Sequence, residues 1–189
     1  MKINPPNCLI KLTGDIYIHK YPLFVTYKPH HHKVKGKEVR EILNKIEPGD
    51  ILLRRFDGYL NTICTPGFWG HAAIYIGKDI VIHSVKEGVI QEDILEFSRC
   101  DSLAILRYIG EKSVINDAIE LAYQFEKQKF EYDYDLVRGN NKVYCTELVD
   151  SCYNGLFVDK YEKILGNEVL TPDNIFNSDK VRKILVIKH

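Results

Sequence analysis

The sequence predicts one α+β domain over residues 1–189, built on a mostly antiparallel sheet of about five or six strands with a cysteine-bearing helix packed against it. Short apolar runs separated by turn residues recur in the middle of the chain, and a few longer stretches have helical spacing. The composition, 45% hydrophobic and 11% aromatic over 189 residues, is typical of a globular domain with a substantial core. We expect an N-terminal extension with one helix (1–46), the core (47–172), and a closing helix and strand (173–189).

Charge and cysteine content narrow the classes of function. With 26 basic and 26 acidic side chains, the chain lacks the basic excess that attracts nucleic acid or an anionic membrane. No apolar stretch is long enough to cross a membrane, and the amino terminus lacks the apolar run of a signal peptide. The five cysteines are scattered and odd in number, which favours a reducing compartment. We therefore expect a cytoplasmic protein without a cofactor. Its partner would be a small-molecule, peptide or lipid substrate rather than nucleic acid, with peripheral lipid contact left open.

The segment before the core is expected to be mostly irregular. Four prolines interrupt its apolar runs, such as 16–18 and 23–25, so we expect no regular structure there beyond one edge strand. The consecutive histidines at 30–32 have no nearby carboxylate or cysteine, which favours a solvated loop over a metal site. Residues 37–46 then have the spacing of an amphipathic helix, which ends at Pro48-Gly49.

The sheet is expected to form from the middle of the chain. Two of its strands should make a β-hairpin around Gly77-Lys78-Asp79, and the loop at 56–69 is long enough to help build the wall of a cleft. The expected strands are residues 50–55, 71–76, 80–85, 89–90 and 103–106, with a helical turn within 92–97.

Three helix signals follow the sheet. Residues 113–127 have an apolar stripe and Ser113 as a candidate cap. A second helix begins near Cys145 and ends at Asn154-Gly155, and Thr171-Pro172 is a typical helix start. The terminal apolar run 184–187 should return to the edge of the sheet.

Cys145 is the candidate nucleophile because of its place at a helix start. A cysteine reacts as the thiolate, and the unpaired N–H groups at a helix N-terminus stabilise that anion. The same N–H groups could stabilise the oxyanion of an acyl-transfer reaction. The alternative is a buried cysteine that acts as a small hydrophobic residue, as we expect of Cys152 in the middle of the same helix.

Two histidines in the hairpin could supply the base and its orienting partner. With a three-residue loop, His71 lies opposite Val85 and His83 opposite Ala73, so both imidazoles emerge on one face of the sheet. A two-residue loop would place them on opposite faces. The alternatives are ordinary hydrogen-bonded histidines, or a zinc site with Cys145, which would lack an evident fourth ligand.

These residues carry a resemblance to a known family. The segments Gly49-Asp50-Ile51-Leu52-Leu53, Gly70-His71-Ala72-Ala73 and Tyr144-Cys145-Thr146-Glu147 resemble the NlpC-type papain-like cysteine hydrolases. Because the histidine precedes the cysteine, the chain is most similar to the circularly permuted branch with YiiX-like proteins and relatives of lecithin retinol acyltransferase. The resemblance covers about residues 47–172.

The resemblance implies a role for each matching residue. Cys145 would be the nucleophile, His71 the general base and acid, and His83 the third polar residue, where many YiiX-like members have a glutamate. Asp50 and the run 132–134 match positions that we interpret as structural or as part of the cleft.

The sequence therefore favours a thiol-dependent hydrolase or acyltransferase that forms an acyl-enzyme from an amide, thioester or lipid ester. Trp69 and Tyr144 flank the proposed catalytic residues and are candidate substrate contacts, with plain core packing as the alternative. The competing hypothesis is a weak or inactive binding module that holds a lipid or amino-acid-like ligand in the same cleft.

Overall fold

The computed structural model describes residues 16–18, 25–27, 32–57, 67–134, 136, 142–164 and 167–189. Cys8, Cys64, two of the three consecutive histidines, the centre of the expected 56–69 loop and residues 138–141 lie outside these residues. The chain divides into two compact units, residues 1–32 and 33–189. In the first, strands β1 (Ile16–Ile18) and β2 (Val25–Tyr27) pair antiparallel in a two-stranded sheet, where we expected one edge strand.

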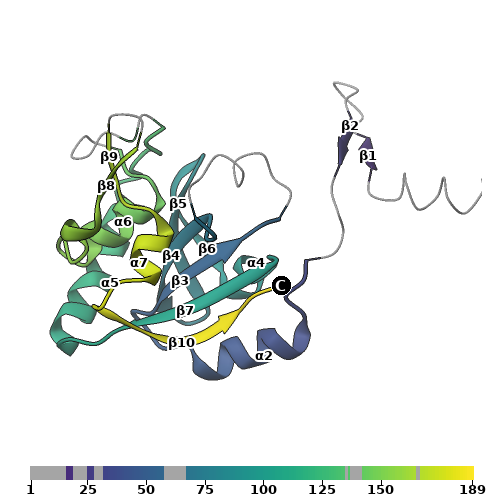
Figure 1. Cartoon of the computed structure of the whole chain (residues 1–189), viewed down its shortest axis with the longest axis horizontal. Helices are drawn as coiled ribbons and strands as arrows, with labels where there is room; N and C mark the ends of the chain where they lie inside the picture. Colours follow the sequence, from purple (N-terminus) through teal and green to yellow (C-terminus); the bar gives the residue numbers. More distant parts are fainter. Residues whose placement is uncertain are drawn as a thin grey trace, which may run out of the picture. The chain divides into compact units, whose positions relative to one another are not determined.

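The second unit contains a six-stranded antiparallel sheet in the order β10-β7-β3-β4-β5-β6 (Figure 1). The strands are β3 (Ile51–Arg55), β4 (His71–Gly77), β5 (Ile80–Val85), β6 (Gly88–Asp93), β7 (Ser102–Tyr108) and β10 (Val181–Ile187). This arrangement confirms the predicted fold class, and β10 at one edge confirms the predicted return of the terminal run. A separate hairpin, β8 (Glu162–Ile164) and β9 (Asn167–Val169), was not predicted.

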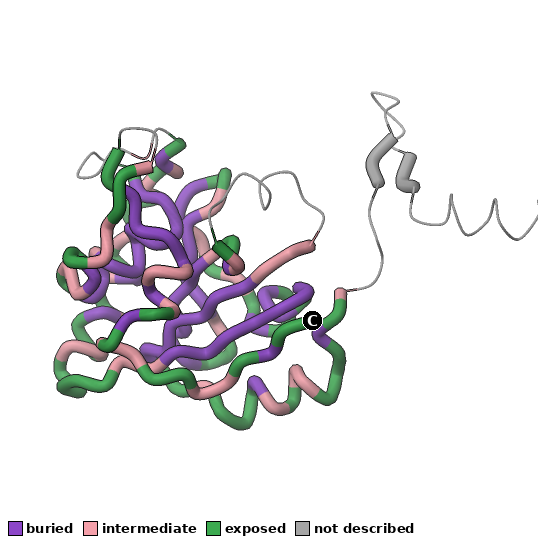
Figure 2. Tube along the Cα trace, viewed as in Figure 1, coloured by how far each residue is buried: buried purple, intermediate pink, exposed green. Residues whose placement is uncertain are grey.

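Helices cover both faces of this sheet. They are α2 (Gly36–Lys45), α4 (Ile94–Phe97), α5 (Lys112–Lys127), α6 (Cys145–Cys152) and α7 (Pro172–Phe176), with a 3₁₀ turn η1 (Val158–Lys160) after α6. One core cluster joins the sheet to α5, α6 and α7, and a second joins its other face to α2 and α4. The central strands are therefore buried along nearly their whole length (Figure 2).

The helix ends agree only in part with the expected caps. Thr171 caps α7 as predicted, because its side chain accepts a hydrogen bond from the backbone N–H of Asn174. Helix α5 instead begins one residue before Ser113, with Glu111 at its N-cap position. The Ser113 hydroxyl lies in the first turn and bonds the Glu111 carboxylate at 3.3 Å.

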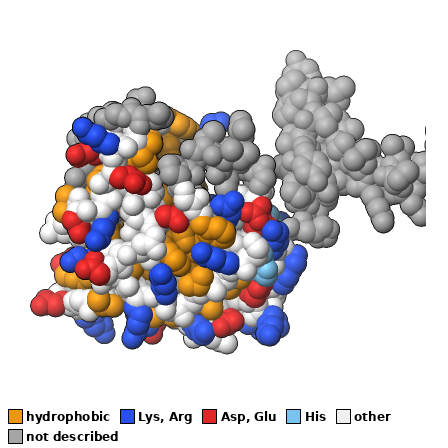
Figure 3. Space-filling model, in the orientation of Figure 1, with side chains coloured by type: hydrophobic (Ala, Val, Ile, Leu, Met, Phe, Trp, Pro, Cys, Tyr) orange, Lys and Arg blue, Asp and Glu red, His pale blue; other side chains and the backbone are white. Residues whose placement is uncertain are grey.

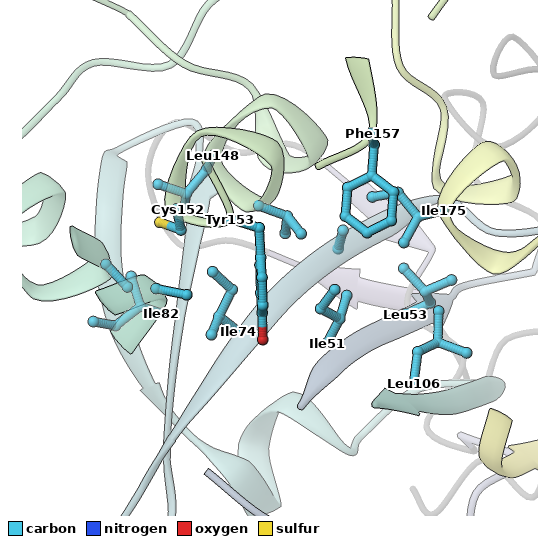
Figure 4. Close-up of a cluster of buried hydrophobic side chains, with 14 of the residues drawn as sticks. Ile51, Leu53, Ile74, Ile82, Leu106, Leu148, Cys152, Tyr153, Phe157 and Ile175 are labelled. Carbon is cyan, nitrogen blue, oxygen red and sulfur yellow. The ribbon is translucent and has the colours of Figure 1, made fainter. Parts of the chain in front are cut away.

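Helix α6 is anchored to the sheet along its buried side. Leu148, Cys152 and the following Tyr153 extend from this helix toward Ile74 and Ile82 of the sheet (Figure 4). Full burial of side chains of this size contributes about 1.5–3 kcal/mol each. These contacts hold the helix, and Cys145 at its start, in a defined position over β4 and β5.

The surface of the second unit carries charges of both signs. On the face seen in Figure 3, basic and acidic side chains are interspersed around exposed apolar atoms. Among the described helices, none has both the length and the apolar character needed to cross a bilayer.

Candidate active site

The two histidines of the β4–β5 hairpin lie on the same face of the sheet, as expected. The loop length and strand register that place them there differ from the expected ones. The loop has two residues, Lys78 and Asp79, both in the left-handed region with φ of 53° and 61°. Alone, this loop would place the histidines on opposite faces. The register shifts between Tyr75 and Gly77, which accommodates one extra residue and restores the expected pairing at Ile74–Ile82.

The two imidazoles are hydrogen-bonded to each other. His71 Nε2 and His83 Nδ1 are 2.9 Å apart, and the rings meet edge to face. Burial, and secondarily the Arg54 guanidinium, lower the pKa of His83 to about 3 and hold the pKa of His71 well below 6.5. Both rings are therefore neutral at physiological pH.

Cys145 is the first residue of α6, as the sequence predicted, and its side chain is buried. Burial raises the pKa of the Cys145 thiol, and this effect outweighs the backbone N–H groups of Ala72, Thr146 and Cys145 itself, which favour the thiolate. The position of Cys145 at a helix start predicted only the opposite effect, stabilisation of the thiolate. The resting state therefore combines a neutral thiol with neutral imidazoles.

The segment that leads into α6 lies against the end of β4 and β5 where these two strands are not paired. The β4–β5 ladder ends at the Ile74–Ile82 pair, so the strands are unpaired at the end that carries the histidines. The Ser84 hydroxyl of β5 donates a hydrogen bond to the Val143 carbonyl at 2.6 Å, which fixes the segment that leads into α6. The Cys145 thiol then lies within reach of the Ala72 N–H, next to His71 in β4. The structure thus brings the cysteine to the strand of the first histidine.

Two charged residues beside the histidines were not identified from the sequence. Arg54 pairs with His71 across the β3–β4 ladder and is only 9% exposed. Its Nη1 contacts Glu92 Oε2 at 3.0 Å, and the same oxygen lies 3.6 Å from His83 Nε2. In the sequence, Arg54 is one of two consecutive arginines at the end of an apolar strand, and its position opposite His71 depends on strand register.

A cavity of about 440 Å³ opens onto His71. Arg54 lines it from β3, and Lys86 lines it from the turn that follows β5. Tyr132 and Tyr134, whose rings are 4.8 Å apart, line it from the segment that we expected to be structural or part of the cleft.

Trp69 and Tyr144 are not among the residues that line this cavity. Trp69 is 1% exposed and packs against Phe68 and Phe176. Tyr144 is also buried, and its hydroxyl accepts a hydrogen bond from the Leu170 N–H. The structure therefore places both in the core, and their contact with substrate stays a prediction.

The zinc alternative is not supported by the geometry. Among the described residues, no group of three or more His, Cys, Asp and Glu side chains is placed to hold a metal ion. His71 Nε2 and His83 Nδ1 face each other at hydrogen-bond distance, so these two nitrogens bond each other rather than a shared ion.

Comparison with known proteins agrees with the predicted fold. Residues 45–185 match the C92 peptidase family, described as permuted papain-like amidase enzymes of the YaeF/YiiX type. Among solved structures, the chain is similar to the metalloprotein yiiX from Escherichia coli O157:H7, with a TM-score of 0.64, 14% identity, and coverage of 77% of this chain and 99% of that one. At this identity the likeness concerns the fold. No match was found among curated proteins.

Proposed function

Because the chain belongs to the C92 family of permuted papain-like amidases, we propose that it cleaves an amide bond with Cys145 as nucleophile and His71 as general base and acid. His83 is the positioning residue in this proposal. The observation that supports the assignment is the 2.9 Å bond between the two imidazoles, together with a thiol at a helix start that lies within reach of the Ala72 N–H in the strand of His71.

The hydrogen bond between the histidines suggests which nitrogens carry protons. When His71 carries its proton on Nε2, it donates to His83 Nδ1, and His71 Nδ1 is free to accept the thiol proton. His83 then carries its own proton on Nε2, toward Glu92 Oε2 at 3.6 Å. This arrangement keeps both rings neutral at rest, in agreement with their lowered pKa values.

The reaction proceeds through an acyl-enzyme in this proposal. As Cys145 Sγ attacks the carbonyl carbon, its proton passes to His71, and the N–H groups at the start of α6 stabilise the oxyanion. The C–N bond breaks, His71 returns the proton to the leaving amine, and a thioester remains. Water activated by His71 hydrolyses the thioester, and a different acceptor in its place would make the protein an acyltransferase.

Alkylation of the cysteines with iodoacetamide tests this assignment without a known substrate. Rates at each cysteine are measured by peptide mass spectrometry across pH, in wild type and His71→Ala. Because His71 stays neutral far below pH 6.5 and the thiol pKa is raised, wild-type labelling of Cys145 should be nearly flat from about pH 6 to about pH 8.5. In His71→Ala it should be about 100-fold slower at neutral pH and rise about tenfold per pH unit.

Cys152 provides a matched control in the same helix. It is buried in the core, burial raises the pKa of its thiol, and its labelling should not respond to His71→Ala. The assignment is wrong if Cys145 labels no faster than Cys152, or if the mutation leaves its rate and pH dependence unchanged. A binding module that uses the same cleft would then be the better account.

A further inference from the structure

Arg54 is a buried cation at the cavity beside His71. Both hydrogen bonds of its guanidinium to described residues are made by Nη1, to Glu92 and to the Phe97 carbonyl. Its Nε is buried and has no hydrogen-bond partner among the described residues. No ligand atom can reach this enclosed Nε, but the Arg54 side chain lines the cavity and its Nη2 makes no hydrogen bond to a described residue. Nη2 is therefore the donor that is available to an acceptor from a ligand.

The other lining residues also suit an anion. Lys86 supplies a second cation, and none of the described lining residues is a carboxylate. Glu92 is already bonded to Nη1, on the side of the guanidinium toward His83. The Tyr132 and Tyr134 rings provide aromatic contact for the remainder of a ligand.

We propose that this cavity binds a carboxylate on the acyl donor, through Arg54 Nη2 with Lys86 as the second cation. The inference rests on the proposed function, because it concerns the substrate of the same cysteine. A carboxylate accepts a charge-assisted hydrogen bond from a guanidinium, which is about twice as strong as a bond between neutral groups. The substrate class is therefore an amide whose acyl portion carries a carboxylate near the scissile carbonyl.

Substrate charge would also act on the catalytic pair. The Arg54 charge disfavours protonation of His71 and favours the Cys145 thiolate. A bound carboxylate partly neutralises this charge, which makes His71 a stronger base when a substrate of the correct charge is present. Arg54 would thus contribute to specificity as well as to binding.

A matched pair of alkylating reagents tests the proposal. Iodoacetate and iodoacetamide form the same Sγ–CH₂ bond with loss of iodide, but only iodoacetate carries a carboxylate. The readout is the iodoacetate to iodoacetamide rate ratio at Cys145, relative to the same ratio for N-acetylcysteine in the same buffer. Because both reagents need the same thiolate, the ratio is insensitive to a changed thiol pKa. We expect the Cys145 ratio to exceed the reference by about tenfold or more at low salt.

The variants separate a specific site from a general charge effect. Arg54→Gln should return the ratio to within about threefold of the reference, and Lys86→Gln should give an intermediate value. Arg99→Gln removes an exposed charge outside the cavity and should leave the ratio unchanged. Should Arg54→Gln fail to fold, Lys86→Gln and the salt dependence of the wild-type protein test the proposal instead. The Cys145 rate ratio should fall toward the N-acetylcysteine reference as salt is raised from about 0.02 M to about 0.5 M.

Each outcome has a distinct meaning. A wild-type ratio equal to the reference, or one that persists in Arg54→Gln, overturns the carboxylate site. If iodoacetamide labelling of Cys145 still depends on His71 in that case, the proposed function stands without this inference. Failure of both reagents to label Cys145 overturns the two proposals together.

Discussion

The His71–His83 hydrogen bond allows the role of the second histidine to be tested quantitatively. In His83→Phe, the new ring keeps the apolar packing near Phe97, whose ring centroid lies 5.7 Å from that of His83. His71 Nε2 loses its acceptor at 2.9 Å, in a site where His83 is 1% exposed. A variant that folds normally but reacts slowly is therefore expected.

The magnitude follows from the type of bond that is lost. A hydrogen bond between neutral groups is worth about 0.5–1.5 kcal/mol, and a buried donor left without a partner costs about 1–3 kcal/mol. At about 1.4 kcal/mol per factor of ten, Cys145 alkylation should slow by about 10- to 100-fold. His83→Gln retains a carbonyl acceptor and should stay within about threefold of wild type.

The assay is iodoacetamide labelling of Cys145 at neutral pH, with the thermal midpoint of each variant as the folding control. A wild-type rate in a folded His83→Phe protein would show that His83 does not position His71. Equal losses in His83→Phe and His83→Gln would indicate that packing, rather than the hydrogen bond, matters at this site.

Two further predictions concern stability. Arg107 pairs with the buried Asp50 carboxylate through Nε and Nη2, each at 2.8 Å, so Arg107→Met should lower the free energy of urea unfolding by about 3–5 kcal/mol. Asp50→Asn added to that variant should recover part of the loss, and no recovery would contradict the ion-pair explanation. The second prediction concerns acid stability, because His83 has a folded-state pKa of about 3 against an ordinary value of 6.5. Below about pH 6.5 the unfolded state binds a proton that the folded state does not, so this group reduces stability by up to about 1.4 kcal/mol per pH unit toward about pH 3. His83→Gln should therefore flatten the decline in unfolding free energy between about pH 6.5 and about pH 5, and an unchanged slope would refute the neutral state of His83.

Local pattern was sufficient for most elements of the second unit. The apolar runs at β4, β5 and β7 and the apolar stripe of α5 are visible in the sequence, because the buried positions of a strand or helix repeat with the period of that element. The short β8–β9 hairpin was missed, since three-residue strands carry too little pattern to identify. The N-cap of α5 was misplaced by two residues, as helix ends depend on local geometry more than on composition.

The residues of the candidate site could be predicted from the sequence where the prediction depends only on residue type and on the order of the motifs. Cys145 at a helix start and two histidines on a hairpin were identified, and the order of these motifs pointed to the permuted family. The loop length of the hairpin was not predicted correctly. A two-residue loop and a compensating bulge produced the register expected of a three-residue loop.

The sequence by itself determined the fold class, the order of the main-sheet strands and longer helices along the chain, and the three residues proposed for the reaction, because these follow from periodicity and motif order. Only the tertiary structure decided the electrostatics. Burial raises the pKa of the Cys145 thiol and lowers those of both histidines, and strand pairing sets Arg54 opposite His71. Desolvation and cross-strand position arise when distant segments pack together, so no local stretch of the chain encodes them.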